Sequence, residues 1–174
     1  MRARLLAKRM DMEDRAERER VLVNRVSRWL HTMPVKRLAF FWPIRGEPSL
    51  AQLITAWLAE DSTRQAALPI VVGELLEFAP WTPSTPMEPG AYGIQVPASK
   101  LRMKPQVLLI PCLGIDENRY RLGYGGGFYD RTLARISPRP VAVGIAFDCA
   151  RLPSIKPQPH DIRLDLALTE SGAL

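Results

Sequence analysis

Residues 107–131 read VLLIPCLGIDENRYRLGYGGGFYDR and predict, in that order, a buried strand, a glycine-rich loop and the start of a helix. Four of the chain's eleven glycines lie between Arg121 and Arg131, and Asp130 follows shortly after the last of them. Because glycine has no Cβ, its backbone can adopt positive φ and bring N–H donors close to a phosphate, while the flanking guanidinium groups supply positive charge. The loop therefore has the composition of an anion-binding site at the start of a helix.

The glycines by themselves also fit a simpler interpretation, a tight turn between a strand and a helix. The run lacks the Gly-x-x-x-x-Gly-Lys-Ser/Thr pattern of a P-loop, and it matches the dinucleotide-binding pattern poorly because no short βαβ unit with a well-placed acidic residue follows. The eleven residues from Arg121 to Arg131, taken together, are more specific than the glycines alone.

Apolar spacing and breaker residues predict that helices and strands alternate along the rest of the chain. A first helix is expected over residues 2–10, a second after a capping pattern at Asp11 and Asp14, and a third after Pro48. The same signals predict strands over residues 37–42, 69–72, 74–78, 107–110, 141–147 and 164–168 and a helix over about 128–136. An irregular loop, suited to a lid or rim, is expected where prolines recur at Pro80, Pro83, Pro86 and Pro89.

This alternation favours an α/β fold made of a single domain over residues 1–174, with a mainly parallel sheet flanked by helices on both faces. Ligands of such sheets bind beyond the carboxyl ends of the strands, and the glycine-rich loop follows such an end.

The composition excludes several classes of protein. The apolar runs are far shorter than the ~20 residues of a membrane-spanning helix, and no apolar signal segment begins the chain, so we expect a cytoplasmic protein without a membrane partner. Two cysteines and two histidines without metal-ligand spacing favour neither a disulfide framework nor a zinc site.

The net charge of +6 could indicate a nucleic-acid partner. Residues 1–31 carry nine Lys or Arg against five Asp or Glu, but acids and arginines alternate there as on a solvated helix face. Aromatic residues that could stack on bases are not interleaved among them. We therefore expect no nucleic-acid partner.

Several segments of the chain carry a family resemblance when they are considered together. Residues 121–130 follow the pattern Arg-Leu-Gly-x-Gly-x-Gly-Tyr/Phe-Tyr-Asp, and residues 111–116 (PCLGID) precede it. Residues 40–47 (FFWPIRGE), 93–97 (GIQVP) and 160–165 (HDIRLD) add further matches, although Gln95 stands where a proline is usual. Over nearly its full length the chain resembles the 5-formyltetrahydrofolate cyclo-ligase family, also called 5,10-methenyltetrahydrofolate synthetase.

The resemblance implies an ATP-dependent ligase of one-carbon metabolism. In the implied reaction, the terminal phosphoryl group of ATP moves to the formyl oxygen of 5-formyltetrahydrofolate, the nitrogen at position ten attacks, and phosphate leaves. The products are 5,10-methenyltetrahydrofolate, ADP and phosphate. The implied partners are small molecules, with ATP as co-substrate and magnesium as metal ion, and we expect a monomer.

The resemblance also assigns roles to individual residues, which we give by the part of the site that each would serve. Phosphate and ATP binding falls to Arg2, Arg9, Arg121, Gly123, Gly125, Gly126, Gly127 and Tyr129, of which Arg121 and Tyr129 are also expected to act in catalysis. Folate binding falls to Trp42, Glu47 and Tyr124, and magnesium binding to Asp130 and Asp165. The sequence does not choose among Arg45, Lys100, Arg102 and Lys104 as the cation that meets the glutamate tail of the folate.

Each of these residues also has a structural explanation. Arg121 could be a solvated loop charge, Tyr129 and Trp42 could fill the core, and Asp130 and Glu47 could be acids that offset a helix dipole. An acid such as Asp165 inside an apolar strand is costly unless it is paired or bound to a metal, which favours a functional role.

The N-terminus departs from the family pattern. A Lys-x-x-x-Arg pair that contacts ATP usually begins the chain, with a second arginine about seven residues later. Arg2 and Arg9 match the two arginines, but the lysine would precede Met1. Either the true start lies upstream, or Arg4 or Lys8 substitutes, or nucleotide affinity is reduced. A catalytically silent relative that binds nucleotide or folate is therefore the alternative to an active ligase.

Overall fold

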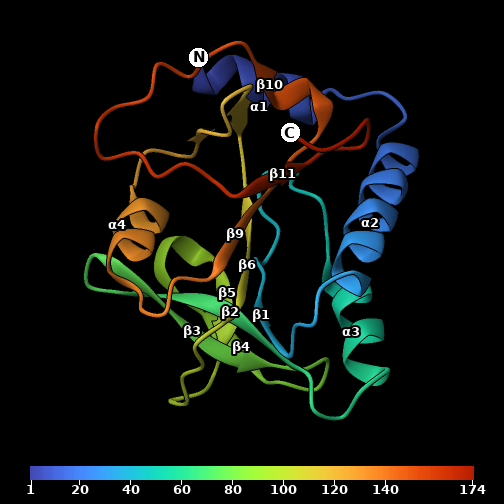
Figure 1. Ribbon diagram of the computed structural model, residues 1–174, viewed down its shortest axis with the longest axis vertical. Helices are drawn as coiled ribbons and strands as arrows, with labels where there is room; N and C mark the ends of the chain where they lie inside the picture. Colours follow the sequence, from blue (N-terminus) through green and yellow to red (C-terminus); the bar gives the residue numbers. More distant parts are fainter.

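The computed structural model describes residues 1–174 and contains four α-helices around a central β-sheet (Figure 1). The helices are α1 (Arg2–Met10), α2 (Arg15–His31), α3 (Ala51–Ala59) and α4 (Phe128–Arg135). The strands of the central sheet are β1 (Arg37–Ala39), β2 (Gln65–Val72), β3 (Leu75–Trp81), β6 (Val107–Pro111), β9 (Val141–Ile145) and β11 (Leu166–Leu168). No helix combines the length and the apolar composition that crossing a membrane requires.

The central sheet has the strand order β11-β9-β6-β1-β2-β3. Every neighbouring pair from β11 to β2 is parallel, and only the edge strand β3 runs antiparallel to its neighbour. The mainly parallel sheet expected from the sequence is therefore confirmed.

Helices cover both faces of this sheet because the side chains of its strands alternate between two apolar clusters. On one face, Leu38 of β1 and Leu109 of β6 pack with side chains of α2 and α3. On the other face, Ala39 of β1 and Leu108 of β6 pack with Leu133 of α4. Figure 1 shows the result, with α2 and α3 on one side of the sheet and α4 on the opposite side.

Smaller elements lie around the central sheet. A hairpin joins β4 (Met87–Pro89) to β5 (Gln95–Pro97), and a three-stranded sheet has the order β10-β7-β8. The bounds of the remaining elements are β7 (Gly114–Asp116), β8 (Arg121–Leu122), β10 (Arg151–Leu152) and the 3₁₀ turns η1 (Ala91–Gly93) and η2 (Asp148–Ala150).

The structure corrects two local expectations. The proline-rich stretch is not wholly irregular, because β3 continues through Pro80 to Trp81 and the hairpin follows. Pro80 is tolerated because β3 is an edge strand, where one side of the backbone needs no partner. Asp14 precedes α2 in a left-handed conformation (φ 51°) and forms no side-chain capping bond, so the predicted capping pattern is not formed.

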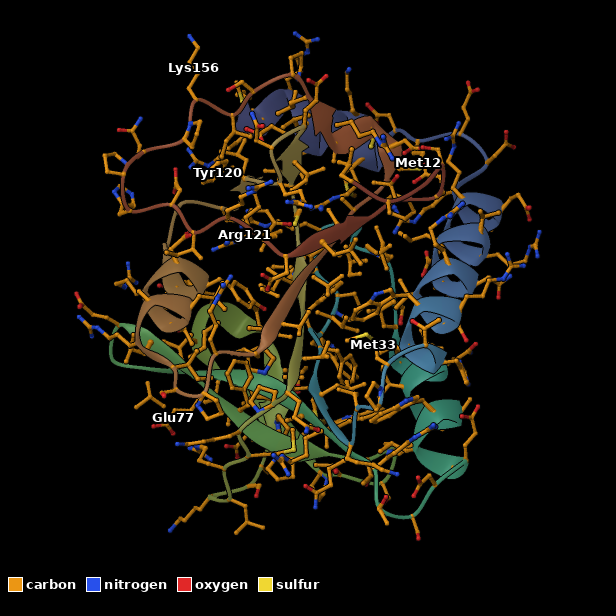
Figure 2. All side chains as sticks on the ribbon, in the orientation of Figure 1. Met12, Met33, Glu77, Tyr120, Arg121 and Lys156 are labelled. Carbon is orange, nitrogen blue, oxygen red and sulfur yellow. The ribbon has the colours of Figure 1, made fainter.

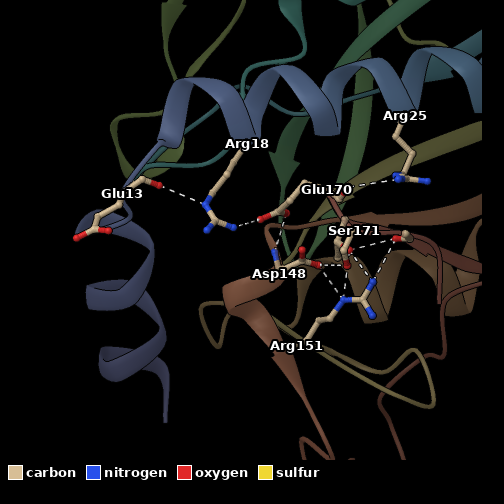
Figure 3. Close-up of polar contacts among 9 residues, drawn as sticks. Glu13, Arg18, Arg25, Asp148, Arg151, Glu170 and Ser171 are labelled. Carbon is tan, nitrogen blue, oxygen red and sulfur yellow. Dashed lines mark hydrogen bonds and ion pairs between the residues drawn. The ribbon is translucent and has the colours of Figure 1, made fainter.

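The C-terminal segment is tied to α2 by a polar network around Glu170, which is buried (Figure 3). Its Oε1 lies 3.2 Å from an Arg18 guanidinium nitrogen, and Arg25 donates to its backbone oxygen at 3.3 Å. Its Oε2 accepts the backbone N–H of Asp148 at 2.7 Å, and the Asp148 carboxylate in turn accepts from Arg151 at 3.0 Å. Both carboxylate oxygens of the buried Glu170 thus have partners, which fixes the end of the chain on the helix.

Candidate active site

A cavity of about 750 Å³ lies beyond the carboxyl ends of the parallel strands, as expected for this type of sheet. Phe41 and Trp42, which follow β1, and Pro111, which ends β6, line one part of it. The glycine-rich loop and the first turn of α4 line another part. The cavity therefore brings residues 40–47 and residues 121–130 together, although about eighty positions separate them in the chain.

The glycine-rich loop is open toward the cavity. Gly125 and Gly127 have positive φ angles of 100° and 65°, and Gly127 is the residue that precedes α4. No hydrogen bond within the protein is donated by the backbone N–H groups of Gly123, Gly125, Gly126 or Gly127. These four donors at a helix start are available to a ligand oxygen, as an anion site requires.

Basic side chains hold the loop through two of its carbonyl oxygens. The Nε of Arg2 donates to the Gly123 oxygen at 2.8 Å, and an Arg131 nitrogen donates to the Gly126 oxygen at 2.8 Å. These two hydrogen bonds use carbonyl oxygens of the loop and leave its N–H groups without a partner in the protein. Arg2, which the sequence assigned to nucleotide binding, also lines the cavity.

Arg121 and Asp130 form an ion pair at the base of the loop. The distance from an Arg121 guanidinium nitrogen to Oδ2 of Asp130 is 2.8 Å, and the two side chains are only 4% and 17% exposed. Both also hold the C-terminal segment, because Arg121 donates to the Ile162 oxygen at 3.4 Å and Asp130 Oδ1 accepts the Ile162 N–H at 2.9 Å. Arg121 accordingly lies between α4 and that segment (Figure 2). It is a buried, fixed charge rather than a solvated loop residue.

Tyr129 lies beneath Arg121 and lines the cavity. The guanidinium carbon of Arg121 is 5.6 Å from the centre of the Tyr129 ring, within range for a cation–π contact. Burial raises the pKa of the Tyr129 phenol, so the group stays protonated at neutral pH. Tyr129 can therefore pack or donate a hydrogen bond, but it has no phenolate with which to act as a base.

Glu47 forms the opposite wall of the cavity and is only 5% exposed. Its Oε2 accepts the backbone N–H of Ile44 at 3.0 Å, and its Oε1 accepts the hydroxyl of Tyr124 at 3.0 Å. Burial raises the pKa of the Glu47 carboxyl, while these two hydrogen bonds and the charge of Arg9 act in the opposite direction. The wall thus presents a carboxylate whose position is set before any ligand arrives.

The remaining expected residues divide between those that the cavity gathers and those that it does not. Trp42, Tyr124 and Arg45 line the cavity, whereas Lys100, Arg102 and Lys104 do not. Arg9 does not line it, but its guanidinium donates to the hydroxyl of Tyr124. Of the four candidate cations, only Arg45 is thus placed to meet a ligand in the cavity.

Asp165 lies outside the cavity, and the structure does not bring it to Asp130. Its Oδ2 accepts the backbone N–H of Ala142 at 2.7 Å, and its Oδ1 is 3.5 Å from an Arg139 nitrogen. Asp165 directly precedes β11 and its side chain is 40% exposed, so it is not an acid buried in an apolar strand and needs no metal ion to compensate its charge. Of the two acids assigned to magnesium, only Asp130 lines the cavity, and the role of Asp165 stays a prediction.

Asp161 is the acidic residue of the cavity that the sequence interpretation missed. It directly precedes Ile162, whose backbone N–H donates to Oδ1 of Asp130, so Asp161 is held next to a residue that binds Asp130. The signal was present, because Asp161 belongs to the HDIRLD segment that carried the family resemblance. Asp165 is the acid of this segment that the sequence assigned to magnesium, because it was expected within a strand.

Comparisons with known proteins agree on one family. The model of the 5-formyltetrahydrofolate cyclo-ligase family matches residues 1–170. The 5-formyltetrahydrofolate cyclo-ligase of Escherichia coli K12 is 32% identical over 148 residues, which cover 81% of this chain and 79% of that one. The enzyme of the same name from Haemophilus influenzae is 29% identical over 136 residues, covering 74% of this chain and 73% of its own.

Solved structures agree with this result. The 5,10-methenyltetrahydrofolate synthetase of Aquifex aeolicus superposes with a TM-score of 0.80 at 29% identity, over 99% of this chain and 89% of that one. The Mycoplasma pneumoniae structure of the same name has a TM-score of 0.79 at 22% identity, over 97% and 96% of the two chains. The second match, at its low identity, concerns the fold alone.

Proposed function

The chain belongs to the 5-formyltetrahydrofolate cyclo-ligase family, and from this premise we propose how its cavity carries out the family's reaction. That reaction is the ATP-dependent cyclisation of 5-formyltetrahydrofolate to 5,10-methenyltetrahydrofolate. The observation that carries the proposal is that a single cavity joins four free N–H donors of the glycine-rich loop to the buried carboxylate of Glu47. One wall suits phosphate, and the other suits the N–H groups of a pterin.

The reaction needs activation because the oxygen of a formamide is a poor leaving group. In the proposed sequence, the formyl oxygen attacks the terminal phosphorus of ATP, and ADP leaves. The nitrogen at position ten then attacks the formyl carbon, its proton is lost, and the formyl oxygen departs as part of inorganic phosphate. Phosphoryl transfer of this kind asks the protein mainly for positioning and charge stabilisation rather than for a nucleophile.

The phosphate half of the cavity supplies that stabilisation. The N–H groups of Gly123, Gly125, Gly126 and Gly127 bind phosphate oxygens, and the positive end of α4 adds to their effect. Arg121 contributes a buried positive charge that Asp130 holds in position. Tyr129 packs under this guanidinium, and Arg2 holds the loop through the carbonyl oxygen of Gly123.

The folate half orients the second substrate. Glu47 accepts hydrogen bonds from the amino and ring N–H groups of the pterin, and Trp42 lies against its flat ring. Of the four cations considered for the glutamate carboxylates of the folate, Arg45 is the one that lines the cavity. Because both halves come from one chain, a monomer suffices for the reaction.

The carboxylates of the cavity fit a magnesium ion that arrives with ATP. The structure has no group of three or more His, Cys, Asp or Glu residues arranged for a metal, so the protein would supply only a few ligands. Asp130 and Asp161 would hold the ion, with phosphate oxygens and water completing its shell, which is the usual arrangement for magnesium on a nucleotide. The ion would neutralise charge on the phosphates during transfer.

A spectroscopic assay tests the proposal. Conversion of 5-formyltetrahydrofolate to the 5,10-methenyl form creates a near-ultraviolet chromophore, so purified protein is mixed with the folate, with and without ATP and magnesium. We expect the chromophore only when both are present, together with equimolar ADP and phosphate. Binding of either substrate without turnover would instead identify a catalytically silent relative.

The fate of the formyl oxygen tests the chemical sequence. With ¹⁸O in the formyl group, the released phosphate should carry one ¹⁸O atom, as measured by mass spectrometry. Phosphate without the label would contradict phosphorylation of the formyl oxygen.

A further inference from the structure

Tyr124 occupies a position that the proposed roles of its neighbours do not explain. It belongs to the glycine-rich loop, yet its hydroxyl binds the folate wall, where it donates to Oε1 of Glu47 at 3.0 Å. The same hydroxyl accepts a hydrogen bond from the guanidinium of Arg9. Its ring contacts two cations, with the guanidinium carbons of Arg45 and Arg9 at 5.0 and 5.9 Å from the ring centre.

The Tyr124 hydroxyl therefore forms one hydrogen bond with a residue proposed for the folate and one with a residue proposed for the nucleotide. Glu47 is the acceptor proposed for the pterin, and Arg9 is one of the arginines assigned to the nucleotide. A hydroxyl has one proton to donate and lone pairs to accept, so a single Tyr124 can serve both partners in the unliganded protein. Glu47 and Arg9 are both buried, which makes loss of these bonds unfavourable unless a ligand replaces them.

The loop is built so that Tyr124 can be displaced. Gly123 and Gly125 flank it, neither has a backbone N–H held within the protein, and the Tyr124 side chain is itself partly exposed. The neighbouring loop glycines carry no side chains that would resist such a shift. A shift of the Tyr124 hydroxyl would therefore also move the neighbouring N–H groups of Gly123 and Gly125.

We propose that Tyr124 is a positioning residue that couples folate binding to nucleotide binding through the bonds of its hydroxyl to Glu47 and Arg9. A pterin that takes Oε1 of Glu47 displaces the hydroxyl from Glu47 and Arg9 and releases the loop, whose glycines line the cavity, for phosphate. Breaking the hydrogen bonds of the Tyr124 hydroxyl costs free energy, and this cost reduces the affinity of whichever ligand binds first. The second ligand binds after these bonds are broken, so each ligand raises the affinity of the other. The inference depends on the proposed function, because it assigns Glu47 to the folate and the loop to ATP.

Calorimetry on the full chain tests this coupling. The dissociation constant of a non-hydrolysable ATP analogue with magnesium is measured without folate and with saturating 5-formyltetrahydrofolate. In the wild-type protein we expect the folate to lower this constant at least about fivefold. In Tyr124→Phe, which keeps the ring in contact with Arg9 and Arg45, the ratio should fall to about one, and folate alone should bind at least as tightly as in the wild type. A purely structural role of the hydroxyl would weaken both ligands instead.

Two further variants make the test specific. Tyr92→Phe removes the hydroxyl of another tyrosine that lines the cavity but forms no hydrogen bond with Glu47, and it should keep the wild-type ratio. Tyr124→Leu removes the ring as well, and it should lose the coupling as Tyr124→Phe does.

Three results would overturn the inference: no coupling in the wild type, wild-type coupling in Tyr124→Phe, or equal loss of coupling in Tyr92→Phe. If Tyr124→Phe keeps the coupling and Tyr124→Leu loses it, the ring is responsible and not the hydroxyl, which also contradicts the inference. Failure of the wild-type protein to bind either ligand is a separate result, because it would contradict the proposed function.

Discussion

The two walls of the cavity are built in opposite ways. On the wall proposed for folate, which contains Trp42, Arg45 and Glu47, the Glu47 side chain is buried and both of its carboxylate oxygens already have hydrogen-bond partners. On the phosphate wall, the glycines of the loop are largely exposed, and their N–H donors have no partner in the protein. The first wall can select a ligand by a fixed acceptor, whereas the second is completed only when an anion arrives. Changes on the two walls should therefore differ in which substrate they affect and in how much they alter stability.

The largest effect is expected at the base of the phosphate wall, for Asp130→Asn. This change leaves the buried Arg121 guanidinium without its ion-pair partner, and it removes a carboxylate proposed for magnesium. We expect kcat to fall at least about a hundredfold and the free energy of unfolding to fall by roughly 3 kcal/mol, as measured by the chromophore assay and by urea unfolding.

Asp165→Asn is the matched control for that change, because Asp165 is also paired with an arginine but lies outside the cavity. Its turnover should stay within about twofold of wild type, since surface pairs contribute little. Loss of turnover equal to that of Asp130→Asn would place Asp165 back in the metal site.

The open wall can be tested by adding a single methyl group to the loop. A Cβ at Gly123 would meet no atom within 4 Å, and its φ is not positive, so Gly123→Ala should fold normally. If phosphate oxygens approach this backbone, the KM for ATP should rise about tenfold or more, while the KM for folate and the melting temperature stay unchanged. An unchanged KM for ATP would favour a plain turn over a phosphate site.

Gly172→Ala provides the control for Gly123→Ala. Gly172 lies outside the cavity, and its added Cβ would come no closer than 4.0 Å to a side chain. Gly126→Ala is less informative, because its Cβ would lie 2.8 Å from ring carbons of Phe128 and the loop would have to shift. A loss of ATP binding there would not separate a blocked phosphate from a distorted loop.

On the closed wall, Glu47→Gln should show the reverse pattern. The KM for 5-formyltetrahydrofolate should rise about tenfold, because an amide cannot accept at both positions, and the KM for ATP should change little. Steady-state kinetics with each substrate varied in turn separates the two effects. A rise in the KM for ATP alone would show that Glu47 serves the nucleotide and not the folate.

The same variant has a pH signature. Burial raises the pKa of Glu47 above its ordinary value of 4.5, so the folded protein holds this proton more tightly than the unfolded chain does. As pH rises through the window between these two values, the wild type loses stability that Glu47→Gln keeps. In urea unfolding, the free energy of unfolding of Glu47→Gln should therefore increase relative to that of the wild type between pH 4.5 and neutral pH. The opposite trend would contradict the raised pKa.

The smallest effect is expected for Trp42→Phe. Phenylalanine keeps a flat ring on the folate wall but covers less of the ligand, so the KM for folate should rise only two- to fivefold, about 0.5–1 kcal/mol. The KM for ATP should not change. A change in the KM for ATP larger than that for folate would contradict the assignment of Trp42 to the folate.

Much of the fold could be predicted because its signals are local. The apolar stripe of α3 and the alternation of apolar side chains in β1 and β6 follow directly from helix and strand geometry. The phosphate wall was equally accessible, since its glycines, Arg121 and Asp130 lie within eleven residues. In both cases, a short stretch of chain contains the information that determines its structure.

The contacts of Glu47 and the acids proposed for magnesium were harder to predict because they depend on contacts between distant residues. The hydrogen bond between Tyr124 and Glu47 joins residues that are 77 positions apart, and only the packing of the loop against the wall reveals it. Asp165 was chosen because an acid in an apolar strand appeared to need a metal, whereas the N–H of Ala142 satisfies it. Asp161 enters the cavity through the course of the C-terminal segment, which no local pattern determines.

The most direct test of the two-wall cavity is a crystal structure of the protein with a non-hydrolysable ATP analogue, magnesium and 5-formyltetrahydrofolate. We expect the terminal phosphate within hydrogen-bond distance of the N–H groups of residues 123–127, and the pterin N–H groups on the Glu47 carboxylate. A nucleotide bound away from the glycine-rich loop, or a pterin that does not contact Glu47, would contradict the account.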